Sequence, residues 1–155
     1  MEKRLIKKIF MVSVLLLIAI GISLFTNYGY KGAFTVLNRK LPIYSVDTKE
    51  KKLAITFDVS LGENDYTEKI LDLLDKYNVK ATFFVVGDWV DRNPDKLKEL
   101  CRRGHEIGNH SNRHPDMTKI SREKIIEDIN INEAKIRSIT GSGTKLFRRP
   151  GGAYD

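Results

Sequence analysis

The stretch HSNRHP, from His110 to Pro115, holds two of the three histidines in this 155-residue chain. His110 and His114 are four residues apart, and side chains with that spacing face the same way on a turn of helix. Two imidazoles on one side of the chain can bind a metal ion. Two ordinary surface histidines in a loop would give the same pattern, so the surroundings of the pair in the fold must decide between these interpretations.

A carboxylate and an arginine are expected to reach the same place as this histidine pair. Asp58 ends a short apolar strand at 52–58, the histidines follow a strand at 105–111, and Arg148 lies near the end of a strand at 145–150. In folds with parallel strands the chemistry is found where strands end and loops begin. Asp58, the histidine pair and Arg148 are therefore predicted to share one rim of a sheet, which favours a functional site over incidental histidines.

Hydrophobic spacing predicts strands and helices in alternation. Residues 66–77 place apolar side chains at helical spacing, 81–87 is rich in aromatic and β-branched residues, and Ser121 is a typical helix cap. Strands that alternate with helices form right-handed βαβ units on a parallel sheet, which predicts the α/β fold class. The expected elements are strand 52–58, helix 66–77, strand 81–87, helix 93–103, strand 105–111, helix 121–140 and strand 145–150.

The first 25 residues predict a membrane anchor. Residues 1–8 are basic, and residues 9–25 are 17 uncharged residues, close to the shortest length that spans a bilayer. A cleaved signal peptide has a shorter apolar stretch and a small-residue cleavage site, and no convincing site follows Phe25. We therefore favour a single-pass signal anchor over a protein secreted after signal cleavage. The basic residues should stay in the cytoplasm, which places a linker at 26–50 and a domain at 51–155 outside.

The charge balance argues against a nucleic-acid partner. The net charge of the chain is +7, but after residue 25 it carries 23 basic and 19 acidic residues, a net charge of +4. No basic run or aromatic–basic pattern indicates a nucleic-acid site, and export argues against one. A mildly basic exported domain suits an anionic cell wall, and a mixed solvated surface explains the balance equally well. The single cysteine, Cys101, excludes an intramolecular disulfide.

Three motifs carry a family resemblance. TFDVS (56–60), HSNRHP (110–115) and FRRPGG (147–152) resemble, in order and spacing, the first three motifs of the polysaccharide deacetylase (NodB-homology) family of carbohydrate esterases. The resemblance covers residues 53–155, and the anchor with Val-Ser after the aspartate looks most like sporulation-type members. It implies the N-terminal part of a distorted (β/α) barrel. It also implies N-deacetylation of an N-acetylhexosamine polysaccharide, peptidoglycan or chitin-like, with cell-wall polysaccharide and the membrane as partners.

The resemblance also implies roles for the residues on the predicted rim. Hydrolysis of an acetamide needs a base for water, an electrophile for the carbonyl, donors for the oxyanion and an acid for the leaving amine. Asp58 resembles the catalytic base of the family, and Arg148 resembles the arginine that orients this base. His110 and His114 resemble two ligands of a divalent metal ion, with zinc the first choice.

The third motif supplies the remaining positions of the site. The backbone N–H of Gly151 matches the oxyanion donor of the family, and Pro150 and Gly152 match substrate-binding positions. His105, which precedes the histidine pair on the same strand, is interpreted as a structural histidine.

The first motif departs from the family pattern at one metal ligand. The family has a pair of aspartates, a base and then a ligand, and Val59 occupies the second position here. Valine cannot bind a metal ion, so we expect weak binding unless Ser60, Glu63, Asp65 or water substitutes.

The family pattern also continues beyond this chain. Its domain proceeds to an acidic–aromatic motif and a Leu-x-His that supplies the general acid, whereas this chain stops at Asp155. We therefore expect a C-terminally incomplete deacetylase domain. An inactive fragment, or a glycan- or metal-binding envelope module, is the alternative.

The uncharged N-terminal segment leads to a prediction about the mature protein. The full chain should fractionate with membranes and keep its N-terminus, because residues 9–25 carry no charge and no cleavage site follows them. Intact-mass measurement of the membrane fraction checks this expectation. A mature start near residues 26–35 would overturn the anchor.

Overall fold

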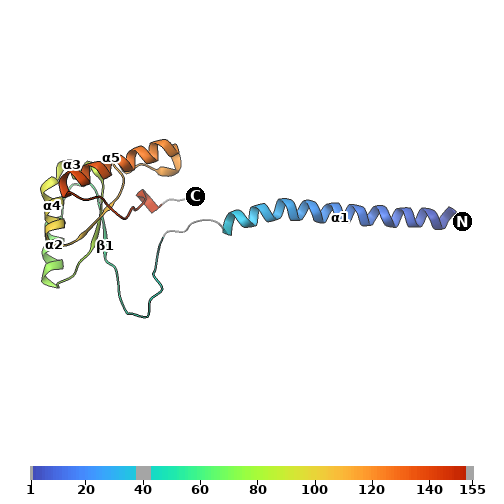
Figure 1. The fold of residues 1–155 in the computed structure, drawn as a ribbon, viewed down its shortest axis with the longest axis horizontal. Helices are drawn as coiled ribbons and strands as arrows, with labels where there is room; N and C mark the ends of the chain where they lie inside the picture. Colours follow the sequence, from blue (N-terminus) through green and yellow to red (C-terminus); the bar gives the residue numbers. More distant parts are fainter. Residues whose placement is uncertain (1, 38–42, 153–155) are drawn as a thin grey trace. The chain divides into compact units, whose positions relative to one another are not determined.

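The computed structural model describes residues 2–37 and 43–152. The chain divides into two units, residues 1–48 and 49–155. The described residues of the first unit include one helix, and the second unit is an α/β domain, drawn in Figure 1.

Helix α1 spans Glu2–Leu37. Its segment Ile6–Leu24 is long and apolar enough to cross a membrane, with a mean hydropathy of 2.2, and cleaved signal sequences share these properties. The predicted linker at 26–50 differs in its first part, because the helix continues to Leu37 and no proline interrupts it. Residues 38–42 of that linker lie outside the described part of the chain, and the described residues that follow form no regular element before β1.

The second unit is built on a parallel sheet in the order β1-β2-β3. Its strands are β1 (Thr56–Val59), β2 (Thr82–Val85) and β3 (Glu106–Asn109). The parallel α/β class predicted from the sequence is therefore confirmed. The predicted fourth strand is wrong in extent, because Phe147 makes only an isolated parallel bridge to Asn109 before the chain turns.

All three predicted helices of this unit are present, and three short elements, α3, η1 and η2, were not predicted. Helix α5 has the expected Ser121 cap, whose side chain accepts from the N–H of Lys124, and it ends at Gly141 with a left-handed φ of 77°. The unpredicted elements are too short to show helical periodicity. The helical elements of the unit are α2 (Thr67–Lys76), α3 (Gly87–Arg92), α4 (Pro94–Arg102), η1 (Met117–Lys119), α5 (Arg122–Thr140) and η2 (Pro150–Gly152).

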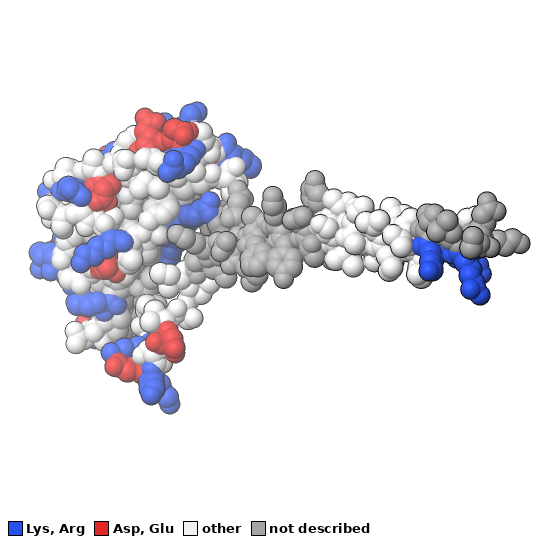
Figure 2. Space-filling view, turned by 45° about the vertical axis from the view of Figure 1, so that its right-hand side comes forward, with Lys and Arg blue, Asp and Glu red and all other residues white. Residues whose placement is uncertain are grey.

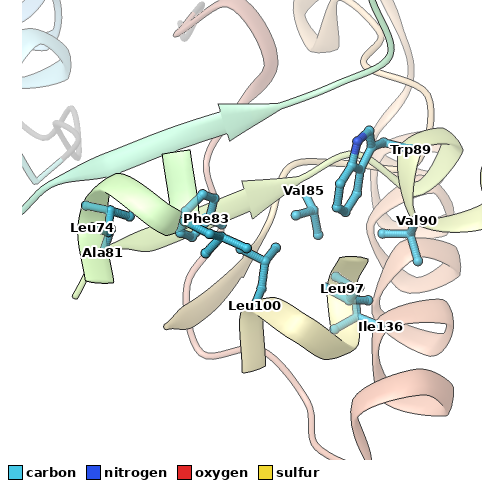
Figure 3. Packing of buried hydrophobic residues seen from close by; sticks show 10 residues of the cluster. Leu74, Ala81, Phe83, Val85, Trp89, Val90, Leu97, Leu100 and Ile136 are labelled. Atoms are coloured by element: carbon cyan, nitrogen blue, oxygen red, sulfur yellow. The ribbon is translucent and has the colours of Figure 1, made fainter. Parts of the chain in front are cut away.

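The core lies between one face of the sheet and helices α2 to α5, as Figure 3 shows. Phe83 and Val85 point from β2 into this core, and the alternation of a strand therefore turns Phe84 to the opposite face. The buried hydrophobic cluster consists of Leu71, Leu74, Ala81, Phe83, Val85, Trp89, Val90, Leu97, Leu100 and Ile136.

The same alternation determines which side chains of β1 can reach a site. Phe57 and Val59 pack against the core cluster. Thr56 and Asp58 therefore point to the opposite, open face of the sheet. The acid that the sequence singled out is thus presented away from the helices.

The packing of helix α2 predicts unequal costs for two neighbouring leucines. Leu71 is fully buried and Leu73 is 55% exposed. Leu71→Ala should lower the free energy of unfolding by about 2–5 kcal/mol, because it leaves a cavity in the core. Leu73→Ala, the matched control, should change it by less than about 0.5 kcal/mol. Urea unfolding followed by the fluorescence of Trp89 measures both, and equal losses would contradict the packing.

Candidate active site

Asp58 and Arg148 form an ion pair on the open face of the sheet. Arg148 Nη1 lies 2.6 Å from Asp58 Oδ1, and Arg148 Nη2 donates to Thr56 Oγ1 at 2.9 Å. The two charged side chains remain 36% and 48% exposed, so a substrate could approach them. The first and third motifs, far apart in the sequence, are therefore in direct contact.

His110 lies beside this pair with its proton on a defined nitrogen. Its Nδ1 is 2.8 Å from the carbonyl oxygen of Arg148. Because a carbonyl only accepts, Nδ1 carries the hydrogen, and the lone pair of the neutral ring is on Nε2. Nε2 lies 3.9 Å from Asp58 Oδ2. Burial lowers the pKa of His110, which is 2% exposed, so the neutral ring is favoured at neutral pH.

A non-helical backbone turn, and not an α-helix, brings the side chain of His114 next to that of His110. The two ring centroids are 4.9 Å apart and the rings meet edge to face at 75°. His114 has φ of 54° and Ser111 has φ of 70°, both in the left-handed region that few non-glycine residues adopt. The N–H of His114 donates to Ser111 Oγ at 2.8 Å. The expectation that the two histidines face the same way is met by a strained turn, of the kind often found at functional sites.

Asp128 on helix α5 holds this turn, and the sequence analysis did not single it out. Its carboxylate accepts from the backbone N–H groups of Asn112 at 2.8 Å and Arg113 at 3.2 Å. One carboxylate thus fixes two consecutive amides between the histidines. An acidic residue on a charged helix gives no signal of such a role, because the contact joins segments 15 and 16 residues apart.

A buried amide network ties helix α5 to the ends of β2 and β3. Asn132 Nδ2 donates to the carbonyl of Val85 at 2.9 Å and to Asn109 Oδ1 at 3.0 Å. Asn109 Oδ1 also accepts from the N–H of Ser111 at 2.9 Å, and Asn109 Nδ2 donates to the carbonyl of Ile129 at 3.0 Å. Asn132 is fully buried. An asparagine among the apolar residues of a predicted helix is the sequence signal that could have shown this network in advance.

The glycine-rich end of the third motif forms a tight turn directly after Arg148. Pro150 is buried, while Gly151 and Gly152 have φ of 63° and 64°. These left-handed conformations explain the need for glycine at both positions. The turn contains Pro150, Gly151 and Gly152, to which the family resemblance assigned the oxyanion donor and the substrate contacts.

Among the described residues, no third histidine, cysteine or acidic side chain completes a metal site with His110 and His114. Val59 packs against the core, and Asp65 is engaged elsewhere, with Trp89 Nε1 at 3.0 Å and Lys96 Nζ at 3.1 Å. Burial would raise the pKa of Asp65, but its hydrogen bonds from Thr67, Trp89 and Lys96 outweigh this and hold that pKa well below its usual range.

Within residues 2–37 and 43–152, no group of three histidine, cysteine or acidic residues could hold a metal ion. The protein groups present thus fall short of the usual zinc set of three or four protein ligands.

His105 lies apart from this site and packs within the fold. Its Nδ1 accepts from the N–H of Ala81 at 3.2 Å, and its ring meets Phe83 edge-on with centroids 5.3 Å apart. These contacts agree with its interpretation as a structural histidine.

Comparison with known proteins gives consistent matches over this unit. The family model described as polysaccharide deacetylase matches residues 45–155. The peptidoglycan-N-acetylmuramic acid deacetylase PdaA of Bacillus subtilis is 41% identical over 69% of this chain and 40% of its own length. A peptidoglycan-N-acetylglucosamine deacetylase of Bacillus cereus is 41% identical over 70% of this chain and 50% of its own length. The chain thus spans half or less of the length of these curated relatives.

Solved structures show the same relationship. The peptidoglycan deacetylase PdaC of Bacillus subtilis superposes with a TM-score of 0.64 and 38% identity, over 71% of this chain and 54% of that one. A CE4 family pseudoenzyme from Bacillus anthracis superposes with a TM-score of 0.65 and 34% identity, over 69% and 38% of the two chains. A peptidoglycan deacetylase and a pseudoenzyme are therefore both among the structural neighbours.

The histidine pair leads to a prediction about metal binding. The full chain in detergent should bind zinc weakly through His110 and His114, and replacing either by alanine should abolish binding in calorimetry. His105→Gln is the matched control and should bind like the parent. Unchanged binding by the double variant of His110 and His114 would show that the ion sits elsewhere.

Proposed function

Because the chain belongs to the polysaccharide deacetylase family, we propose that residues 51–155 supply part of an active site that removes acetyl groups from a cell-wall polysaccharide. The bond hydrolysed is the non-peptide amide of an N-acetylhexosamine. Peptidoglycan is the favoured substrate and a chitin-like polymer is the alternative. The named relatives that act on peptidoglycan support this choice.

The contact between Asp58 and Arg148 beside His110 is the observation that carries the proposal. Arg148 occupies Oδ1 of the carboxylate, which leaves Oδ2 as the oxygen that can accept a proton from water. That oxygen faces Nε2 of His110, so the Asp58 carboxylate and the unprotonated nitrogen of His110 border the same space on the open face of the sheet. The pair is far enough from the core to meet a substrate and is held in one orientation.

A divalent ion at the two histidines is part of this proposal. His110 offers the tautomer that a metal ligand needs, because its other nitrogen donates to a backbone carbonyl. Such an ion would polarise the acetyl carbonyl. With Val59 in place of a carboxylate, His110 and His114 would hold it weakly.

A second function is favoured by the same substitution. A domain that keeps the fold and the Asp58–Arg148 pair but binds metal poorly could bind glycan without turnover. The presence of a pseudoenzyme among the matched structures supports this alternative. The two functions differ in the expected role of Asp58. In a deacetylase Asp58 is needed for the formation of acetate, and in a glycan-binding domain it supports only the local structure.

The proposed location is the outer surface of the cell membrane, with α1 as a single-pass anchor or as a signal that is removed. Figure 2 shows basic and acidic side chains interspersed on the visible face of the α/β unit. A mixed surface of this kind argues against a nucleic-acid partner. The likeness to sporulation-type family members is part of the same proposal.

The proposed base can be tested by acetate release from peptidoglycan or from N-acetylglucosamine oligomers. The 155-residue chain alone should release no appreciable acetate, because its three histidines are already assigned and no histidine acid remains among them. Joining it to the segment of the Bacillus cereus relative that follows the matched region should give activity. Asp58→Asn should then reduce the rate by roughly 10²–10⁴-fold, the usual contribution of a general base.

Asp95→Asn is the matched control for this experiment, because Asp95 is 92% exposed on α4 and pairs only with Lys98 among the described ion pairs. It should leave the rate unchanged. Ordinary turnover by the short chain would mean that the acid comes from another source. An unimpaired Asp58→Asn fusion would exclude Asp58 as the base.

A further inference from the structure

Phe84 lies under the guanidinium group that holds the proposed base. The centre of the Arg148 guanidinium is 4.1 Å from the centroid of the Phe84 ring, which is a cation–π contact. Phe84 is 6% exposed, yet it is absent from the hydrophobic core cluster. Its ring therefore lies on the open face of the sheet, to which Asp58 also points.

Gly108 makes room for this ring. Phe84 is paired with Asp58 on one side and with Gly108 on the other, so the three residues form one row across the sheet. A Cβ at position 108 would lie 2.4 Å and 2.6 Å from two ring carbons of Phe84. Any larger residue would displace the ring, so the lack of a side chain at Gly108 leaves the space that the Phe84 ring occupies.

The Phe84 ring restricts the orientation of the Arg148 guanidinium, which the ion pair with Asp58 alone does not fix. With side chains 36% and 48% exposed, a pair of this kind is held weakly when it stands alone. The guanidinium of Arg148 has Asp58 and Thr56 at its edge and Phe84 on one of its faces. The edge contacts fix its direction and the ring fixes its plane, so the three together define one orientation of Arg148.

We propose that Phe84 is a positioning residue that acts through Arg148 on Asp58, and that Gly108 leaves the space that the Phe84 ring requires. The role of Asp58 as a base rests on the proposed function. The positioning itself does not, because it concerns only the placement of the arginine. Simple core filling does not explain the arrangement, since Phe84 faces away from the helices that cover the core.

The arginine resonances of the full chain in detergent micelles test this proposal. The Nε–H signal of Arg148, assigned by its loss in Arg148→Lys, should be shifted by the aromatic ring in the parent. Phe84→Leu should abolish the ring shift and raise the rate of hydrogen exchange at this group about two- to fivefold, the factor that corresponds to an exposed cation–π contact. Phe84→Tyr keeps an aromatic face and should restore both values.

Phe83→Leu is the matched control, because Phe83 lies next to Phe84 on β2 but points into the core and stacks on Phe57. It should lower stability without moving the Arg148 signal. Gly108→Ala is the second test, because it keeps Phe84 and only displaces its ring, and it should reproduce the loss of the ring shift. It decides the outcome if Phe84→Leu does not fold.

An unchanged Arg148 signal in folded Phe84→Leu or Gly108→Ala would overturn the proposal, and so would an equal change in Phe83→Leu. These measurements require no turnover. Their failure is therefore distinguishable from failure of the proposed deacetylation, which the Asp58→Asn fusion tests.

Discussion

Arg148 makes decisive contacts at both of its ends, and the geometry of the site depends on them. Its guanidinium holds Asp58, while its backbone carbonyl accepts the Nδ1 proton of His110. Its own N–H donates to the carbonyl of Asn109 at the end of β3, which keeps the segment at a fixed distance from the sheet. The position of one residue therefore sets the orientation of the acid and the tautomer of the histidine at the same time.

Helix α5 supports the other half of the site by polar rather than apolar contacts. Asn132 and Asp128 lie four residues apart on this helix and reach the ends of the strands and the histidine turn. A buried amide network gives a unique geometry where its groups are paired, as Asn132 Nδ2 and both polar atoms of the Asn109 side chain are. Asn132 Oδ1 is also buried, and it has no hydrogen-bond partner among the described residues. The left-handed conformations of Ser111 and His114 can persist because backbone groups in the turn have fixed partners on the helix and the strand.

Much of this arrangement could be predicted from the sequence, because motifs at the ends of parallel strands must meet at one rim. That rule brought Asp58, His110 and Arg148 together correctly. Contacts across the sheet or from a distant helix could not be predicted, because no local pattern encodes which residue faces Phe84 or Asp128. The predicted extent of the fourth strand was wrong for a related reason. Its apolar start at Leu146 and Phe147 signals a strand, but the length of a strand depends on the partner that it pairs with.

The row formed by Asp58, Phe84 and Gly108 has a consequence for how this domain can vary among organisms. Inserted residues in the surface loops between elements would leave the row intact, so those loops are free to change in length during evolution. A single inserted or deleted residue inside β1 would instead turn Asp58 toward the helices and bring Phe57 or Val59 to the open side. Lineages should therefore tolerate length variation around these strands and almost none within them.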